Sequence, residues 1–94
     1  MVFDWNNDKN QLLKEERDIS FERIVVAIKN DHLLDILEHP NVEKYSNQLL
    51  LLVEIDDYVY VVPCVIENDV CFLKTIFPSR KYTDEYLPGK RRNK

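Results

Sequence analysis

Residues 48–77 read QLLLLVEI DD YVYVVPCVI END VCFLKTIF, and this stretch decides the fold. It contains three runs of leucine, β-branched and aromatic residues, separated by Asp56-Asp57 and by Glu67-Asn68-Asp69. Runs of this composition predict strands, and such short connections predict hairpins. The asparagine and aspartate of the second connection can adopt the left-handed backbone that glycine usually supplies in tight turns. The stretch therefore predicts an antiparallel three-stranded meander.

Two features of this stretch point beyond a simple meander. Pro63 lies in the middle run and predicts either a bulge there or a less central position for that strand, because proline has no backbone N–H for the sheet. The four leucines Leu49 to Leu52 place apolar side chains on both faces of one strand. Either both faces of the sheet are covered, or one face waits for a partner, which favours an obligate complex.

The first half of the chain predicts a brief strand and two helices. Val2 to Trp5 is a short apolar segment, and a polar helix is expected from about Asn7 to Arg17. A second helix begins after Ser20, a good N-cap residue. Apolar residues then recur at helical spacing, namely Phe21, Ile24, Val25 and Ile28. Residues 32–38 suit either an extension of that helix or a strand, and we favour the strand.

These elements predict an α+β fold in which two N-terminal helices pack on one face of a mainly antiparallel sheet of four to five strands. We expect residues 1–88 to form a single domain that ends in one helical turn from Thr83 to Leu87. Residues 89–94 form a basic tail that we expect to be disordered.

Composition and charge exclude several classes of protein. The 94 residues are 45% hydrophobic and 32% charged, which is typical of a globular domain. No run approaches the ~20 apolar residues of a membrane helix, and no secretory signal is visible, so we expect a cytoplasmic protein. Cys64 and Cys71 are expected to be reduced, buried thiols.

Charge is unevenly distributed along the chain. Residues 1–78 hold seven basic and 15 acidic side chains, a net charge of −8, whereas residues 79–94 carry +4. An acidic body argues against broad binding to nucleic acid but leaves room for a basic patch at one end. His32 and His39 do not have metal-ligand spacing, and the single glycine, Gly89, excludes phosphate-cradling loops. We therefore expect no metal and no cofactor.

The residues that remain as candidates for chemistry are Lys74, Arg80, Lys81, Tyr82 and Tyr86. Clustered cations can hold a backbone phosphate and stabilise the charge that develops when it is cleaved. RNA supplies its own 2′-hydroxyl nucleophile, and aromatic rings can stack an unpaired base. The simpler alternative is a lysine on the solvent face of a strand and two cations in a surface loop.

Short motifs along the chain resemble those of one known family, the BrnT-type toxins. Phe3-Asp4-Trp5, followed by Lys9 and Asn10, resembles the family's F-x-W-D-x-x-K-N start. The segment ISFE at 19–22 matches its I-S-F-E, and PSRK at 78–81 lies where the family has S-A-R-K. Glu85 and Tyr86 follow as in the family's ending. The resemblance covers about residues 3–87.

This resemblance implies a prokaryotic ribonuclease toxin with a RelE-like fold, which inhibits translation by cutting RNA without a metal and is held by a cognate antitoxin. It implies that Arg80 and Lys81 hold the scissile phosphate, that Lys74 adds charge, and that Tyr82 or Tyr86 binds the RNA. The family's K-H-G before I-S-F-E is Glu16-Arg17-Asp18 here, so one acid/base histidine is missing. Glu15 or Glu16 is an unranked candidate for the base.

A second hypothesis belongs to another class of protein. A toxin-like domain without catalysis would bind a partner protein, or a second copy of itself as a homodimer, through its apolar sheet. Growth arrest and RNA cleavage by the protein produced alone would distinguish the two hypotheses.

Overall fold

The computed structural model describes residues 1–44 and 47–89. Strands and helices follow one another in the order predicted, with one further strand near the C-terminal end. The helical turn expected from Thr83 to Leu87 is found, but it begins three residues earlier, at Arg80. The elements are β1 (Val2–Trp5), α1 (Asn7–Arg17), α2 (Phe21–Lys29), β2 (Leu33–Glu38), β3 (Gln48–Ile55), β4 (Tyr58–Glu67), β5 (Val70–Leu73), β6 (Phe77–Pro78) and α3 (Arg80–Tyr86). The α+β class and the strand at residues 33–38 are confirmed.

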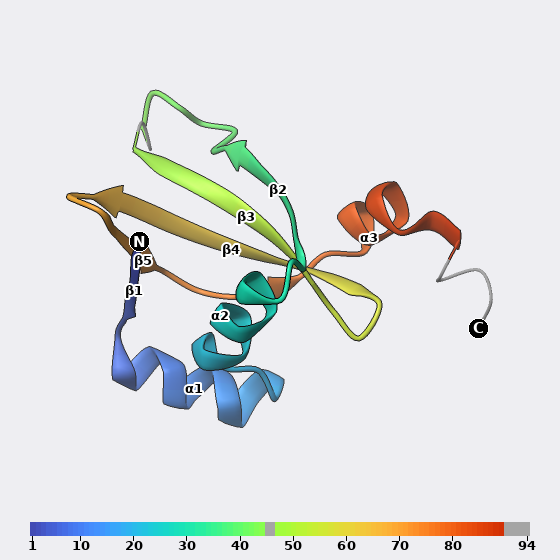
Figure 1. The fold of residues 1–94 in the computed structure, drawn as a ribbon, viewed down its shortest axis with the longest axis horizontal. Coiled ribbons are helices and arrows are strands. Elements are labelled where there is room, and N and C mark those ends of the chain that lie inside the picture. The colour runs from blue at the N-terminus through green and yellow to red at the C-terminus, as the bar shows by residue number, and fades with distance from the viewer. Residues whose placement is uncertain (45–46, 90–94) are drawn as a thin grey trace.

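The strands form one mixed sheet with the order β1-β5-β4-β3-β2 (Figure 1). The meander β3-β4-β5 is antiparallel as predicted, and β2 adds antiparallel to β3. In contrast, β1 pairs parallel with β5, which aligns Val2 with Val70. The short β6 pairs with β4 beyond the point where β5 ends. The sheet is therefore five strands wide and mainly antiparallel, as expected, with β6 as an additional strand and β1 as its one parallel member among the described residues.

Two-residue turns close both hairpins of the meander. Asp56 and Asp57 have φ values of 53° and 63°, and Asn68 and Asp69 have φ values of 49° and 69°. Two consecutive left-handed residues match the twist of the flanking strands, and asparagine and aspartate tolerate that conformation better than other non-glycine residues. The expectation that Asn68 and Asp69 adopt the left-handed backbone is confirmed, and Asp56 and Asp57 adopt it as well.

One buried asparagine joins the two N-terminal helices. The Oδ1 of Asn10 accepts a hydrogen bond from the Phe21 backbone N–H at 2.8 Å, and its Nδ2 donates to Glu22 Oε1 at 2.7 Å. Asn10 is almost fully buried, so both of its polar groups need these partners. Its hydrogen bond is the main reason that the pKa of Glu22 is lowered. The start of α2 is therefore fixed by α1 as well as by the Ser20 cap, whose Oγ accepts from the Arg23 N–H.

The main core lies between α1, α2 and one face of the sheet, which we call the helix face. Leu13, Phe21 and Ile24 of the helices pack against alternate strand residues, including Leu51 and Val62. Phe21 also stacks on Trp5 of β1, with ring centroids 5.7 Å apart. The packing of both N-terminal helices on one face agrees with the prediction from the spacing of their apolar residues.

The opposite face of the sheet carries α3, and we call it the α3 face. Leu50, Leu52, Val59 and Val61 form a second buried cluster with Tyr82, Tyr86 and Leu87. The two N-terminal helices share the helix face as predicted, whereas the C-terminal helix lies on the other face, which was not predicted (Figure 1). This second layer explains the four leucines. Both faces of β3 are covered within the chain, so the leucine run requires no partner.

Pro63 of β4 lies opposite the point where the strand pairing beside β4 is interrupted, between β5 and β6. The alternative of a less central strand is wrong, because β4 lies inside the sheet. The register of β4 with β3 runs without a shift through Leu50↔Pro63, but on its other side the pairing shifts by one residue between Cys64↔Leu73 and Val61↔Phe77, so the expected bulge is found there. The irregular residues lie in the segment between β5 and β6, which runs beside β4. The Lys74 N–H donates to the Pro63 carbonyl at 2.8 Å, and residues 74–76 then leave the ladder before β6 begins. Proline has no N–H to offer on that side, which accounts for the break.

Candidate functional site

The predicted site residues lie on and before α3, so the way this helix is held determines their positions. Ser79 caps the helix: its Oγ accepts from the Tyr82 N–H at 3.1 Å, and its own N–H donates to the Val59 carbonyl at 2.9 Å. Thr83 is fully buried, and its Oγ1 accepts from the Val59 N–H at 2.9 Å and donates to the Ser79 carbonyl at 2.7 Å. Ser79 and Thr83 thus replace a neighbouring strand at the start of β4.

A second contact holds the C-terminal end of α3. The Tyr86 hydroxyl donates to Asp35 Oδ2 at 2.6 Å, and Asp35 Oδ1 accepts from the Ile36 N–H at 2.8 Å. The hydrogen bond from Tyr86, followed by the one from the Ile36 N–H, lowers the pKa of Asp35. The same bond raises the pKa of Tyr86 to about 12. This carboxylate therefore connects β2, at the edge of the sheet, with α3.

The predicted cations lie along one side of the molecule rather than around one point. Phe72 is on the α3 face, since its neighbours Cys71 and Leu73 belong to the helix-face core. Lys74 extends back over the Phe72 ring, with Nζ 5.8 Å from the centroid. The prediction of Lys74 within a strand is wrong, because β5 ends at Leu73.

The Lys74 backbone and the start of α3 are each anchored to β4, at two β4 residues that are four positions apart. The Lys74 N–H bonds to Pro63, whereas the Ser79 N–H bonds to Val59. Four residues of a strand span about 13 Å. The backbones that carry the three cations are therefore spread along β4 rather than gathered at one position. We call five residues between β5 and the first turn of α3 the strip. They are Phe72, Lys74, Phe77, Arg80 and Lys81.

Arg80 and Lys81 are exposed at the first turn of α3. Within residues 1–44 and 47–89, no hydrogen bond or ion pair engages the Arg80 guanidinium. The Lys81 Nζ lies 5.4 Å from the centroid of the Tyr82 ring. An unneutralised guanidinium beside a lysine is the feature of the strip most suited to an anion.

The two predicted tyrosines contribute to the packing of α3 on the sheet. Tyr82 and Tyr86 pack against the buried cluster of the α3 face, and their rings meet edge to face with centroids 6.2 Å apart. The Tyr86 hydroxyl is already bonded to Asp35. Stacking of a base on either ring remains a prediction, and only the half-buried Tyr82 lies beside a cation of the strip.

Arg17 was not singled out by the sequence, although the structure brings it to this region. Its Nη1 donates to the Ile76 carbonyl at 2.5 Å, across 59 residues of chain. It thus supports the irregular segment 74–76, which lacks a full set of strand hydrogen bonds. In the resemblance to the toxin family, Arg17 occupies the position of the histidine in K-H-G. Glu15 and Glu16, the candidate bases, lie on α1 and hence on the helix-face side, and Glu15 accepts a hydrogen bond from Gln11.

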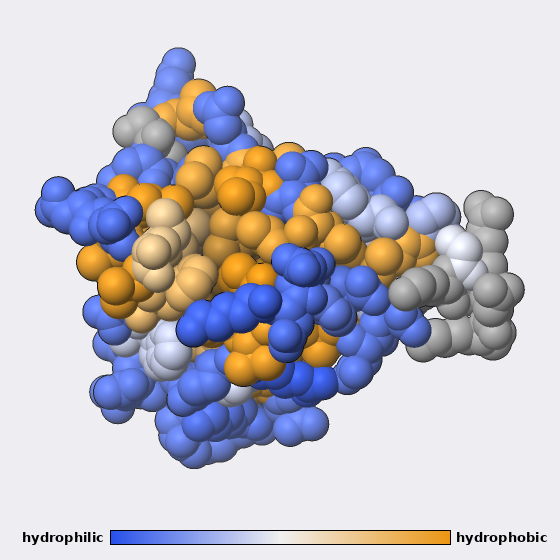
Figure 2. All heavy atoms as spheres, viewed as in Figure 1, coloured by the Kyte–Doolittle hydropathy of each residue, from blue (hydrophilic) through white to orange (hydrophobic). Residues whose placement is uncertain are grey.

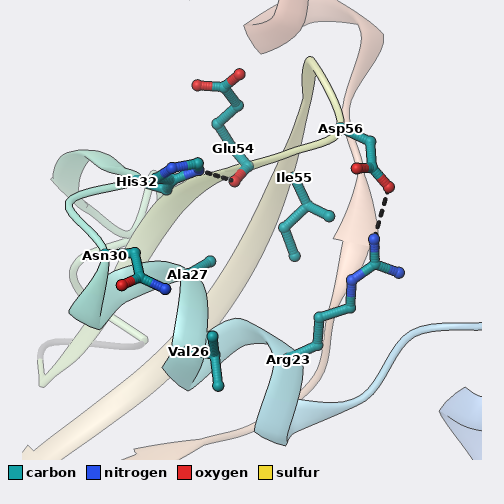
Figure 3. A pocket seen from close by; sticks show the side chains of 8 residues that line it. All are labelled: Arg23, Val26, Ala27, Asn30, His32, Glu54, Ile55 and Asp56. Carbon is teal, nitrogen blue, oxygen red and sulfur yellow. Dashed lines mark hydrogen bonds and ion pairs between the residues drawn. The ribbon is translucent and has the colours of Figure 1, made fainter.

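A polar hollow lies between α2 and the β3–β4 turn (Figure 3). Arg23 forms an exposed ion pair with Asp56 at 2.6 Å on one side, and on the other side the His32 Nδ1 lies 3.3 Å from the Glu54 carbonyl. Figure 3 shows the Glu54 carboxylate directed away from the hollow. Because Arg23 is neutralised by its partner, the hollow offers an RNA phosphate no free cation.

An apolar groove crosses the helix face beyond α2. No polar atom lines it, and Figure 2 shows hydrophobic side chains gathered across this face above the helices. Ile36 on its β2 side is 51% exposed. The groove is lined by Met1, Phe3, Ile28, Leu33, Ile36, Leu51, Ile66 and Cys71.

Cys64 and Cys71 are buried free thiols, as predicted, and burial is the main cause that raises the pKa of each. The part of the chain that the structure describes contains no cluster of three or more residues able to hold a metal ion. None of its helices is long and apolar enough to cross a membrane. The predicted disordered tail lies outside the described residues, except for Gly89.

Comparison of the chain with protein-family models, with curated proteins and with solved structures gives no match.

Proposed function

We propose that this protein is an RNA-acting toxin of a type II toxin–antitoxin pair and that the strip is the surface on which it holds RNA. The observation that carries the proposal is the Arg80 guanidinium, which has no partner within residues 1–44 and 47–89, next to Lys81 at the start of α3. The Lys74 backbone is anchored to β4 about 13 Å from the anchor of Ser79, the residue before Arg80. Three cations along one side of an otherwise acidic domain form a local site for a phosphate backbone.

The proposed reaction is RNA cleavage without a metal. The 2′-hydroxyl of RNA would pass its proton to water and attack the adjacent phosphate to form a 2′,3′-cyclic phosphate, while the P–O5′ bond breaks and the O5′ of the next nucleotide takes a proton from water. Arg80 and Lys81 would stabilise the negative charge that develops on the phosphate oxygens, and Lys74 would hold a neighbouring phosphate. Translation would be the process inhibited, which places the toxin in the cytoplasm and its action on messenger RNA, on or off the ribosome.

The proposed fold relationship is to RelE-like toxins. Two N-terminal helices on one face of a largely antiparallel sheet support it. So does the location of the segment PSRK, which follows the last strand and begins α3.

The test is inducible production of the protein alone in bacterial cells, with growth and RNA integrity as the measurements. The wild type is expected to arrest growth and to fragment RNA, whereas Arg80→Ala with Lys81→Ala is expected to do neither while keeping its fold. A matched control is Lys9→Ala with Lys29→Ala, which removes the same charge from α1 and α2. Arrest by the double variant at wild-type strength would contradict the proposal, as would a harmless wild type.

The second candidate function is a binding module without catalysis, and the apolar groove is the observation that favours it. Its eight lining residues leave hydrophobic surface open beside the edge strand β2. The described residues carry 17 acidic and nine basic side chains. Charge complementarity therefore favours a partner whose apolar segment is flanked by lysine or arginine, such as a helix of an antitoxin.

Calorimetry with a 14-residue leucine–lysine amphipathic peptide tests this candidate. Binding is expected for the wild type and not for Ile36→Asp, which places a charge in the groove. Val26→Asp is the matched control, because Val26 is similarly exposed but does not line the groove. Equal binding by all three proteins would show nonspecific attraction and would remove the groove from consideration.

A further inference from the structure

Two phenylalanines and a lysine follow one another along the α3 face at regular spacing. Phe72 pairs with Val65 of β4, the Lys74 N–H bonds to Pro63, and Phe77 pairs with Val61. Their partners on β4 are each two residues apart and so point to the same face. The irregular segment opposite Pro63 contains one extra residue between Lys74 and Phe77. Phe72, Lys74 and Phe77 therefore lie on the same face of the sheet.

The aromatic members of this line remain accessible. Phe77 is 39% exposed although it is one of the largest hydrophobic side chains of the domain, and Phe72 is half-buried. The ring of Phe72 has Lys74 above it, whereas the position beside it on β1 is Asp4, whose Oδ1 accepts from the Trp5 N–H. The aromatic residues that pack against the buried cluster beneath α3 are Tyr82 and Tyr86, and Phe72 is not among its partly buried members. Both phenylalanines thus keep ring surface that the described residues leave uncovered.

We infer that Phe72 and Phe77 are base-stacking positions and that the strip takes single-stranded RNA with unstacked bases. This inference rests on the proposed function and names its substrate class. Two residues of a strand advance about 6.7 Å, so the two rings are about 13 Å apart with Lys74 between them. Stacked bases rise only 3.4 Å per nucleotide, so an extended strand spans the two rings with fewer intervening nucleotides than a stacked one.

The chemistry of the strip agrees with this substrate class. Aromatic rings bind unpaired bases of any sequence because every base has a flat face, and interleaved cations hold the backbone between them. A paired base in a duplex presents no free face. The carboxylate of Asp4 beside Phe72 repels phosphate, so the base rather than the backbone lies at that end of the strip.

The experiment measures binding by fluorescence anisotropy. The probe is a fluorescein-labelled 12-nucleotide RNA of mixed sequence, 2′-O-methylated to prevent cleavage, either alone or annealed to its complement. The wild type is expected to bind the single strand at least tenfold more tightly than the duplex. Phe77→Leu is expected to weaken single-strand binding about fivefold or more and to leave duplex binding unchanged. Phe77→Trp restores a ring and is expected to restore binding.

Two further variants separate the ring from the charge and from the fold. Lys74→Gln is expected to reduce the salt dependence of single-strand binding by about 0.7 in the slope of log K against log salt. Phe3→Leu, the same substitution on the helix face, is expected to leave RNA binding unchanged. Equal binding of both RNA forms with a neutral Phe77→Leu would overturn the stacking inference and leave the proposed function standing. Failure to bind either RNA would overturn both.

Discussion

Replacement of Thr83 by valine removes one hydroxyl and leaves the shape of the side chain almost unchanged. In the wild type this hydroxyl accepts from the Val59 N–H at 2.9 Å in a fully buried position. The Ser79 carbonyl, to which it donates, keeps the helical bond from the Thr83 N–H at 3.0 Å. The variant therefore leaves a single buried donor, the Val59 N–H, without a partner, which costs about 1–3 kcal/mol.

Urea denaturation and thermal unfolding measure this cost. A domain of this size loses about 4–8 °C in Tm for each kcal/mol, so Thr83→Val is expected to lower the Tm by at least about 4 °C. Thr83→Ser also destabilises, because it deletes a buried methyl group, but it keeps the hydroxyl. Amide hydrogen exchange of Val59 separates the two: it accelerates in the valine variant relative to the serine variant. An equally protected Val59 amide in both variants would refute the account of how α3 is held.

Two more predictions concern the other polar contacts that join elements. Asn10→Ala removes the acceptor of the buried Phe21 N–H and should destabilise the domain by about 1–3 kcal/mol, with the pKa of Glu22 rising toward its ordinary value in an NMR titration. Tyr86→Phe should raise the pKa of Asp35 toward the ordinary 3.8. Because the folded-state pKa is lowered, this stabilisation is present above pH 3.8 and is lost as the pH falls through the folded-state value, so unfolding measured against pH should show the variant and wild type converging in acid.

Much of the fold could be predicted from local signals. The Ser20 cap, the helical spacing from Phe21 to Ile28, and the two-residue turns each depend on neighbouring residues only. The parallel pairing of Val2 with Val70 could not be found in this way. It joins segments 68 residues apart, and no local pattern indicates which edge of the meander a short N-terminal strand will join.

The candidate site residues remain a prediction, and their arrangement differs from the one that the sequence indicated. Lys74, Arg80 and Lys81 do lie on one side of the molecule, but the sequence indicated a convergent cluster, whereas hydrogen bonds to β4 space them along a strand. The roles of Tyr86 and Arg17 depend on partners at Asp35 and Ile76, 51 and 59 residues away in sequence. Such contacts follow from the packing of α3 and α1 against the sheet and not from spacing along the chain.

Pro63 connects the fold with the proposed site. A residue with an N–H at position 63 would allow the segment beside β4 to continue as one strand from Val70 onward. Its side chains would then alternate strictly between the two faces. Phe77 would then fall on the opposite face from Phe72 and Lys74, because its number differs from theirs by an odd count. The irregular segment opposite the proline shifts that alternation by one residue, returns Phe77 to the α3 face beside Val61, and buries Ile76 on the helix face. A proline that weakens the sheet locally is thus what places the second ring on the same side as the first ring and the cations.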